Sequence, residues 1–217
     1  MRSIDLLNIS GPYGAGKDTM IDAVLGEFGP LIHRVRTLTT RPSSSFADPS
    51  YTTLPHDEFV KATLGSNWIV NQQLSGTVSY ATDLDEICEA SAEGKLCVHA
   101  IFAGDAGAGE LRRRLGSRLV SVGIQVNEGN IDQQLATLRD RLLVRGRESR
   151  EAIEQRVNHQ HEVVRYVLDN PEVVADDGKA YKVFDYRLTN DDLDAARSKI
   201  ITIAASTLQG TCLWINY

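Results

Sequence analysis

Apolar residues occur along the chain in two patterns that alternate with each other. Short segments rich in apolar residues, which predict strands, cover residues 3–9, 31–38, 96–102, 119–126 and 183–188, and residues 96–102 form a continuous apolar run. Segments with apolar residues three and four positions apart, which predict helices, cover residues 18–28, 57–64, 84–92, 110–115, 131–144 and 190–208, with a further helix ending at residue 168. Strands that alternate with helices predict an α/β domain with a mainly parallel sheet.

Three stretches between these elements lack a regular period. Residues 41–55 contain three prolines and three consecutive serines, which predicts a loop or an irregular lobe. Residues 68–74 and 77–80 flank Gly76 in the manner of a hairpin. Residues 170–179 are predicted to form a surface loop.

The composition is that of one globular domain. The 217 residues include 23 Lys and Arg against 29 Asp and Glu, and a net charge of −6 argues against binding to nucleic acid or to an anionic membrane. Cys88, Cys97 and Cys212 form no metal-binding spacing, and their odd number argues against a disulfide framework. No apolar stretch is as long as a membrane span, and the N-terminus lacks the pattern of a signal peptide. We therefore expect a cytoplasmic monomer or homodimer.

A phosphate-binding loop is predicted between the first strand and the first helix, where the chain reads Gly11-Pro12-Tyr13-Gly14-Ala15-Gly16-Lys17. Glycines allow the backbone N–H groups to approach a phosphate closely, and the N-terminus of the following helix adds a favourable dipole. The lysine supplies a positive charge to the β- and γ-phosphate oxygens. The residues predicted to bind ATP here are Gly11, Tyr13, Gly14, Ala15, Gly16, Lys17, Asp18 and Thr19.

Two residues after the loop lysine are candidates for binding Mg²⁺. A Ser or Thr that binds the metal usually follows the lysine of such a loop, but here Asp18 follows it and Thr19 comes next. Either Thr19 supplies the hydroxyl ligand or Asp18 meets the metal through water. An alternative is that Asp18 is a first-turn helix residue stabilised by the helix dipole.

Arginines are concentrated in residues 139–156 of this acidic protein. Positioned guanidinium groups stabilise the charge that develops in phosphoryl transfer, often from a mobile lid. We interpret Arg141, Arg145 and Arg156 in this way, with Gly146 as a hinge. The alternative is a solvated helix face with ion pairs four residues apart, and this interpretation is favoured for the pairs Arg147–Glu151 and Arg150–Glu154.

Taken with the loop, further motifs in a fixed order resemble the guanylate kinase superfamily of P-loop kinases. They are Thr39-Thr40-Arg41-Pro42, then Gly76 followed by Tyr80-Ala81-Thr82, then Arg141-Leu142, Arg145-Gly146 and Arg156, and last Phe184-Asp185-Tyr186 followed by Asn190-Asp191-Asp192-Leu193. Each motif alone is weakly specific, whereas the ordered set covers most of the chain and is specific.

The resemblance implies a P-loop kinase fold with a five-stranded, mainly parallel sheet and flanking helices. It implies a single domain, with a core at residues 1–38 and 94–208, an acceptor lobe at about 39–82 and an arginine lid at about 141–156. The implied activity transfers the γ-phosphoryl group of ATP, with Mg²⁺, to a phosphorylated small molecule such as GMP. By matched position, the acceptor would be bound by Arg41, Tyr80 and Thr82, the transition state would be neutralised by Lys17 and the three lid arginines, and adenine would lie near Asn190.

The acceptor side departs from the family pattern and leaves other functions open. The guanine-reading glutamate falls near Val70, the family's second phosphate arginine is replaced in residues 43–45, and the usual aspartates are missing from residues 98–104. Glu86, Gln72 and Gln73 are the candidate substitutes for the glutamate. His99 is interpreted as a buried structural histidine, with a catalytic base as the alternative.

Two alternatives to a GMP kinase follow. The first is a ribose 1,5-bisphosphate phosphokinase, which the chain resembles in Gly16-Lys17-Asp18 and in Arg145-Gly146-Arg147-Glu148. The second is a non-catalytic guanylate-kinase-like binding module. The intact phosphate loop argues against the second, because such modules tend to lose the loop glycines and lysine.

Overall fold

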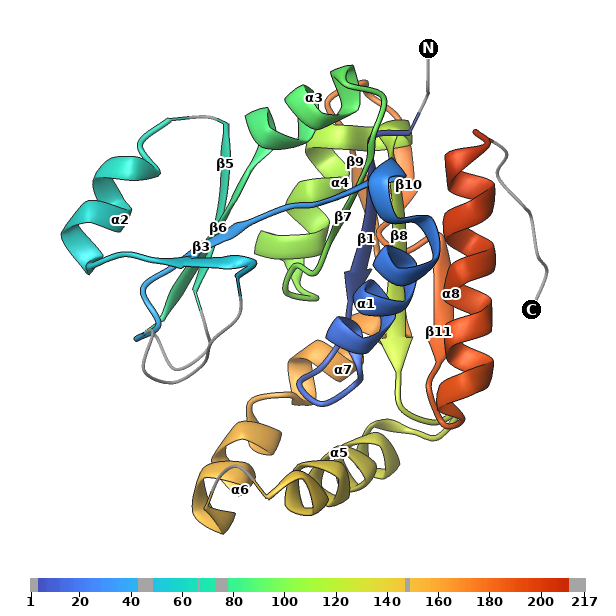
Figure 1. Ribbon diagram of the computed structural model, residues 1–217. Coiled ribbons are helices and arrows are strands. Elements are labelled where there is room, and N and C mark those ends of the chain that lie inside the picture. Colours follow the sequence, from blue (N-terminus) through green and yellow to red (C-terminus); the bar gives the residue numbers. More distant parts are fainter. Residues whose placement is uncertain (1–3, 43–48, 66, 73–77, 147–148, 211–217) are drawn as a thin grey trace.

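The core of the protein is a five-stranded parallel sheet with the strand order β11-β8-β1-β7-β2 (Figure 1). Its strands are β1 (Leu6–Ser10), β2 (Ile32–Arg34), β7 (Leu96–His99), β8 (Leu119–Gln125) and β11 (Tyr186–Thr189). The computed structural model describes residues 4–42, 49–65, 67–72, 78–146 and 149–210. The predicted α/β class and the parallel sheet are confirmed.

Helices cover both faces of this sheet. On one face lie α1 (Lys17–Phe28) and α8 (Leu193–Leu208), and on the other lie α3 (Leu84–Ala92), α4 (Glu110–Leu115) and α7 (His161–Asp169). Side chains alternate between the faces along a strand, so Leu7 and Ile9 pack with α1 and α8 while Leu6 packs with α3 and α4. A strand buried on both faces is uniformly apolar, which explains the continuous runs in the sequence.

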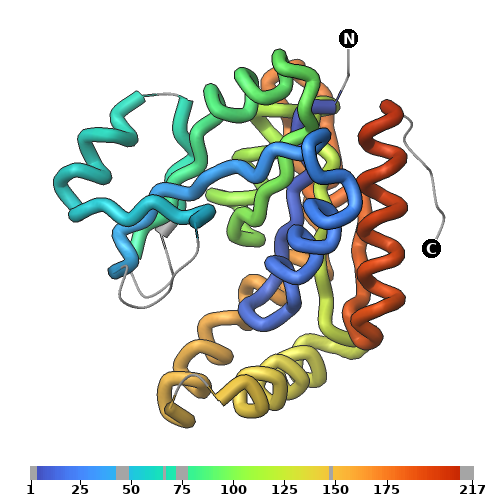
Figure 2. The backbone as a smooth tube through the Cα atoms, viewed as in Figure 1, coloured from blue at the N-terminus to red at the C-terminus, as the bar shows by residue number. Residues whose placement is uncertain are grey.

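A second sheet of four strands stands beside the core, in the order β4-β3-β6-β5 (Figures 1 and 2). It contains β3 (Thr37–Thr39), β4 (Tyr51–Thr53), β5 (Trp68–Gln72) and β6 (Ser79–Asp83), with α2 (His56–Ala62) following β4. β6 runs antiparallel to β3 and β5, which confirms the predicted pairing of the hairpin strands. Residues 43–48 and 73–77, including Gly76, lie outside the described residues.

The single strand predicted over residues 31–38 is wrong. It is two strands, β2 in the core sheet and β3 in the second sheet. The N–H of Val35 still donates to Val98 O of β7, whereas the N–H of Thr37 donates to Ser50 O, so the chain changes sheets at residue 36. Both halves are extended and carry apolar residues among polar ones, and this pattern does not distinguish one partner sheet from another.

Helices α5 (Ile131–Arg145) and α6 (Arg150–Asn158) form an arm at the lower end of the core in Figure 1. α5 begins at a capping box of Asn130 and Gln133 and ends at Gly146, whose φ of 63° is left-handed. Ser149 caps α6 by accepting a hydrogen bond from the N–H of Ala152. The helix predicted to continue to residue 168 is instead two helices, because α6 ends at Asn158 and α7 begins at His161.

Two further predictions near the C-terminus need correction. The surface loop predicted at residues 170–179 contains β9 (Glu172–Val174), which pairs with β10 (Ala180–Lys182). The strand predicted at residues 183–188 begins at Tyr186, because Asn170 holds the backbone of Phe184 by two hydrogen bonds before the chain enters the sheet. No helix within the described ranges is long and apolar enough to cross a membrane. The division into core, acceptor lobe and lid stays a prediction.

Candidate active site

The phosphate loop leaves the carboxyl end of β1 and leads into α1. Gly14 and Gly16 have left-handed φ angles of 83° and 93°, which a side chain would strain. Gly11 is required for a different reason: a Cβ there would lie 2.7 Å from Ile124 O of β8. The first N–H groups of α1 lack partners within the helix and point along its N-terminal dipole, so this end of α1 can bind an anion.

Lys17, the first residue of α1, folds back over the loop. Its Nζ donates hydrogen bonds to Gly11 O at 3.0 Å and to Pro12 O at 2.9 Å. Desolvation by burial lowers the pKa of Lys17, and the neighbouring Asp18 acts in the opposite direction. The ammonium group is therefore held at the loop by two carbonyl oxygens.

Asn190 ties the loop to the end of the core sheet. Its Nδ2 donates to Ala15 O at 2.7 Å, and its backbone N–H donates to Gln125 O at 2.8 Å. Its carbonyl oxygen accepts a hydrogen bond from Arg141 of α5. The structure thus places Asn190 against the loop backbone, in contact with one of the predicted lid arginines.

The three predicted lid arginines occupy different environments. Arg141 is half-buried, and desolvation lowers its pKa. Arg145 is exposed at the last residue of α5, and Arg156 of α6 lies with its guanidinium carbon 4.3 Å from the centre of the Tyr13 ring. The predicted ion pair of Arg150 with Glu154 is not formed. Within the described residues, Glu154 instead pairs with Arg139 at 2.8 Å, because α5 packs beside α6.

The second predicted ion pair, Arg147 with Glu151, involves a residue outside the described part of the chain. Arg147 and Glu148 lie outside the described residues, and with them the predicted pair of Arg147 with Glu151.

The predicted acceptor residues Arg41 and Tyr80 lie together at one end of the second sheet. Arg41 NH1 donates to the Tyr13 hydroxyl at 3.2 Å, which connects this sheet to the phosphate loop. Tyr80 packs edge-to-face against Tyr51, with 6.5 Å between ring centres. Burial raises the pKa of Tyr80, and a hydrogen bond with Arg41 opposes this shift. Tyr51 is a site residue that the sequence analysis missed.

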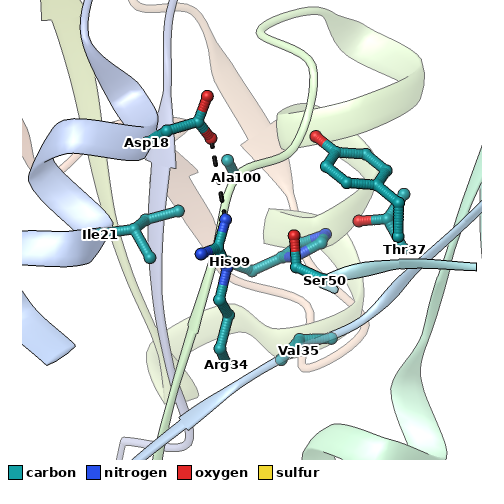
Figure 3. A pocket seen from close by; sticks show the side chains of 9 residues that line it. Asp18, Ile21, Arg34, Val35, Thr37, Ser50, His99 and Ala100 are labelled. Carbon is teal, nitrogen blue, oxygen red and sulfur yellow. Dashed lines mark ion pairs between the residues drawn. The ribbon is translucent and has the colours of Figure 1, made fainter. Parts of the chain in front are cut away.

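A pocket lies between α1, β2 and the second sheet, and it joins the start of α1 to Tyr51 (Figure 3). Arg34 reaches from the end of β2 into this pocket, where its NH2 atom lies 3.9 Å from Asp18 Oδ1. The Asp18 side chain is 65% exposed. Ser50 and Thr37 line the pocket as well. Arg34 and Ser50 were not expected there.

His99 and Thr82 meet inside the protein at the wall of this pocket. Thr82 Oγ1 and His99 Nε2 are 2.8 Å apart, and both residues are buried. Desolvation lowers the pKa of His99 to about 4, so the imidazole is neutral at pH 7. These observations favour the structural interpretation of His99. Thr82, predicted to bind the acceptor, has its hydroxyl engaged by His99.

The candidate substitutes for the guanine-reading glutamate do not meet at the pocket. Val70 on β5 is 41% exposed. Glu86 lies on α3, where its Oε1 is 2.7 Å from His33 Nε2 and accepts from the N–H of Arg36, and it does not line the pocket. Gln73 lies outside the described residues, and so does the side chain of Gln72. Among the described lining residues, Asp18 carries the one carboxylate.

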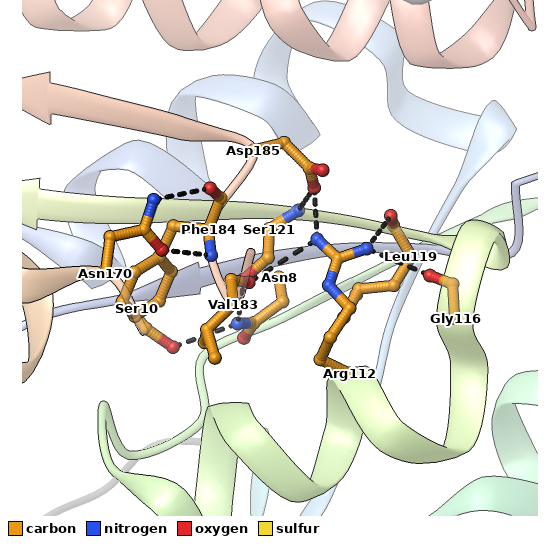
Figure 4. Close-up of polar contacts among 10 residues, drawn as sticks. All are labelled: Asn8, Ser10, Arg112, Gly116, Leu119, Ser121, Asn170, Val183, Phe184 and Asp185. Carbon is orange, nitrogen blue, oxygen red and sulfur yellow. Dashed lines mark hydrogen bonds and ion pairs between the residues drawn. The ribbon is translucent and has the colours of Figure 1, made fainter. Parts of the chain in front are cut away.

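A buried polar network joins α4 to the amino ends of β8 and β11, at the end of the core sheet opposite the phosphate loop (Figure 4). Arg112 of α4, 1% exposed, donates to Gly116 O and Leu119 O and forms an ion pair with Asp185. Asp185 also accepts from the N–H of Ser121, which links the chain before β11 to β8. At the carboxyl end of β1, where the phosphate loop begins, Ser10 donates to Ile101 O at 2.8 Å and accepts from Asn8 Nδ2 at 2.9 Å.

Comparisons with known proteins agree with the motifs. The chain is 25% identical over 200 residues to the guanylate kinase of Helicobacter pylori, covering 92% of this chain and 86% of that protein. It is 28% identical over 211 residues to the guanylate kinase of Rubrobacter xylanophilus, covering 97% and 98%. A crystal structure of guanylate kinase from Anaplasma phagocytophilum superposes with a TM-score of 0.62 at 15% identity over 94% of this chain and 85% of that one. No family model matches the sequence. The P-loop kinase fold is confirmed.

Proposed function

We propose, from its place in the guanylate kinase superfamily, that this protein is an ATP-dependent kinase that transfers the γ-phosphoryl group of ATP to a nucleoside monophosphate, with GMP as the first candidate. The observation that carries the proposal is the convergence of the phosphate loop with Arg41, Tyr80 and Arg156 around Tyr13. The proposed compartment is the cytoplasm, where ATP is available to such a reaction.

The donor half of the site is the loop and the start of α1. The loop N–H groups and Lys17 would hold the β- and γ-phosphates, with Gly11, Gly14, Ala15 and Gly16 shaping the loop. Asn190 would keep the loop in this shape through Ala15 O, and adenine would lie beside it. Phosphoryl transfer needs positioning and positive charge more than covalent chemistry. We assign the positive charge to Lys17, Arg141, Arg145 and Arg156.

The start of α1 also fits a magnesium ion. Mg²⁺ prefers oxygen ligands and keeps several waters, and the Asp18 carboxylate and the Thr19 hydroxyl supply such ligands. Residues 18 and 19 point about 100° apart around the helix, so one of them faces the phosphates more directly than the other. The Asp18 side chain is 65% exposed, so an ion can reach it. Bound there, Mg²⁺ would screen the phosphate charge.

In the acceptor half, Arg41 and Tyr80 would bind the phosphate group of the acceptor. Thr82 would stabilise the wall of the pocket through its hydrogen bond with His99. One observation favours a second acceptor class. Among the described lining residues the one carboxylate is Asp18, which we assign to the metal, and Arg34 lies 3.9 Å from it, so the lining offers a guanine no other carboxylate for its N1–H and amino donors. A second anionic group suits Arg34, so a sugar bisphosphate such as ribose 1,5-bisphosphate is the alternative acceptor.

The test is acceptor-dependent release of ADP from ATP and Mg²⁺. The panel is GMP, dGMP, the other nucleoside monophosphates and ribose 1,5-bisphosphate. Turnover with GMP and no turnover with the sugar bisphosphate supports the first proposal, and the reverse result supports the second. ATP binding without turnover on any acceptor would refute both and indicate a non-catalytic nucleotide-binding module.

A further inference from the structure

A tyrosine lies at the centre of the candidate site, at the third position of the phosphate loop. The Tyr13 hydroxyl accepts a hydrogen bond from Arg41 NH1 at 3.2 Å. The guanidinium carbon of Arg156 lies 4.3 Å from the ring centre, and Lys17 Nζ lies 5.8 Å from it. The backbone N–H of Tyr13 donates to Gln160 Oε1 at 2.8 Å. One side chain of the loop therefore contacts three positive charges.

The two arginines reach Tyr13 from different parts of the fold. Arg41 follows β3 of the second sheet, whereas Arg156 belongs to α6 in the arm. In the sequence, Arg41 and Arg156 lie 28 and 143 positions after Tyr13, respectively. Gln160, at the start of α7, anchors the loop backbone to the segment that follows α6. Tyr13 is thus the common contact of the loop, the second sheet and the arm.

A tyrosine suits this place because guanidinium groups repel one another unless a partner separates them. The negative face of the ring attracts Arg156, and the hydroxyl oxygen accepts from Arg41. Neither contact needs a charge on the tyrosine, so Tyr13 does not repel an incoming phosphate. A serine or glycine at this position would reach neither arginine.

We infer that Tyr13 is a positioning residue, which holds Arg41 and Arg156 across the transfer site before the substrates bind. The inference rests on the proposed phosphotransfer function and adds a residue that orders its acceptor side. Arginines held in place before the reaction require less reorganisation as charge develops on the transferring phosphoryl group. Tyr13 touches these arginines rather than the reacting atoms.

Two substitutions separate the two contacts. Tyr13→Phe keeps the ring beside Arg156 and removes the oxygen that receives the Arg41 hydrogen bond. We expect the KM for the acceptor to rise about three- to tenfold, with a smaller change in kcat and in the KM for ATP. Tyr13→Leu removes both contacts and leaves an apolar side chain, and we expect kcat to fall about tenfold or more in addition. If Tyr13 only filled space, Tyr13→Phe, which keeps the ring, would leave the acceptor KM at the wild-type value.

The control is Tyr181→Phe, which removes a hydroxyl that donates to Asp177 at 2.7 Å on the surface. Its kinetic constants should equal those of the wild type. Wild-type acceptor KM and kcat in Tyr13→Leu would overturn the inference.

A second measurement needs no substrate and separates this inference from the proposed function. Hydrogen exchange is followed in α6 (Arg150–Asn158) of the wild type, Tyr13→Phe and Tyr13→Leu proteins without nucleotide. Faster exchange in Tyr13→Leu alone supports the hold on Arg156, and equal exchange in all three proteins overturns it. Absence of turnover with every acceptor would refute the kinase, and the exchange would still decide whether Tyr13 holds Arg156.

Discussion

Asn190 donates a hydrogen bond from Nδ2 to the carbonyl oxygen of Ala15, with 2.7 Å between the two atoms, and so holds the phosphate loop from behind. The loop leaves room for this contact because residue 16 is glycine: a Cβ there would lie 2.5 Å from Asn190 Nδ2. Arg141 donates to the carbonyl oxygen of the same asparagine. One residue after β11 thus determines both the shape of the loop and the place of an arginine in α5.

Removing this hydrogen bond should weaken ATP binding. For Asn190→Ala and Asn190→Asp, neither of which can donate to Ala15 O, we expect the KM for ATP to rise about tenfold, the loss that a buried hydrogen bond implies. Steady-state kinetics at varied ATP would measure it. Asn67→Ala, which removes an exposed hydrogen bond to Asp85, is the matched control and should leave this KM unchanged. Unaltered ATP kinetics in Asn190→Asp would contradict the assignment.

Lys17→Ala should abolish turnover and leave the fold intact. The ammonium group is held by two loop carbonyls, and its loss removes the positive charge nearest the proposed phosphate site. We expect kcat to fall by a factor of about 10² to 10³ or more, as for other groups that stabilise a transition state electrostatically. Coupled ADP release and circular dichroism would measure activity and folding. The control Lys95→Ala removes an exposed pair with Glu93. Near-normal activity in a folded Lys17→Ala protein would refute the mechanism.

Arg112→Leu should destabilise the whole fold rather than one binding step. Arg112 is 1% exposed and its ion pair with Asp185 bridges α4 to the chain before β11, so its removal leaves Asp185 without its partner. Breaking a buried pair costs about 3–5 kcal/mol of unfolding free energy. Denaturant unfolding would measure the loss. Arg118→Leu, which removes a more exposed pair with Asp5, should cost about 1 kcal/mol or less. Equal losses in the two variants would contradict the prediction.

Local sequence patterns predicted the elements that depend on local interactions. The predicted bounds of α3 and α4 agree with the structure, and α1 and α5 differ by one residue. The division of residues 31–38 between two sheets was missed, because an apolar extended run is compatible with either sheet. β9 and β10 were missed because they pair with each other in a short hairpin at the surface.

The site shows the same contrast between local and distant interactions. The phosphate loop was predicted because its residues are consecutive and their spacing reflects the chemistry. Arg34, Tyr51 and Gln160 were missed because each reaches the site through folding of a distant segment. Tyr13 was predicted as a loop residue, but its contacts with two arginines depend on how the second sheet and the arm are placed.

Acidification should destabilise the protein through His99. The histidine is buried against Thr82, and desolvation lowers its pKa from 6.5 to about 4. Between these two pH values the unfolded chain binds a proton at His99 and the folded protein does not. The unfolding free energy therefore falls as the pH is lowered from 6.5 to 4, by up to about 3 kcal/mol from this residue. Above pH 6.5 this contribution is constant.

Denaturant unfolding at a series of pH values would measure this effect. His99→Gln has no imidazole to protonate, so its unfolding free energy should fall less steeply than that of the wild type between pH 6.5 and 4. The wild type and the variant should therefore become more similar in unfolding free energy as the pH is lowered, because only the wild type loses the stability that the neutral His99 contributes. His56→Gln, at an exposed position on α2, is the control and should follow the wild type. Parallel curves for wild type and His99→Gln would contradict the prediction, because His99 would then contribute nothing to the pH dependence of stability.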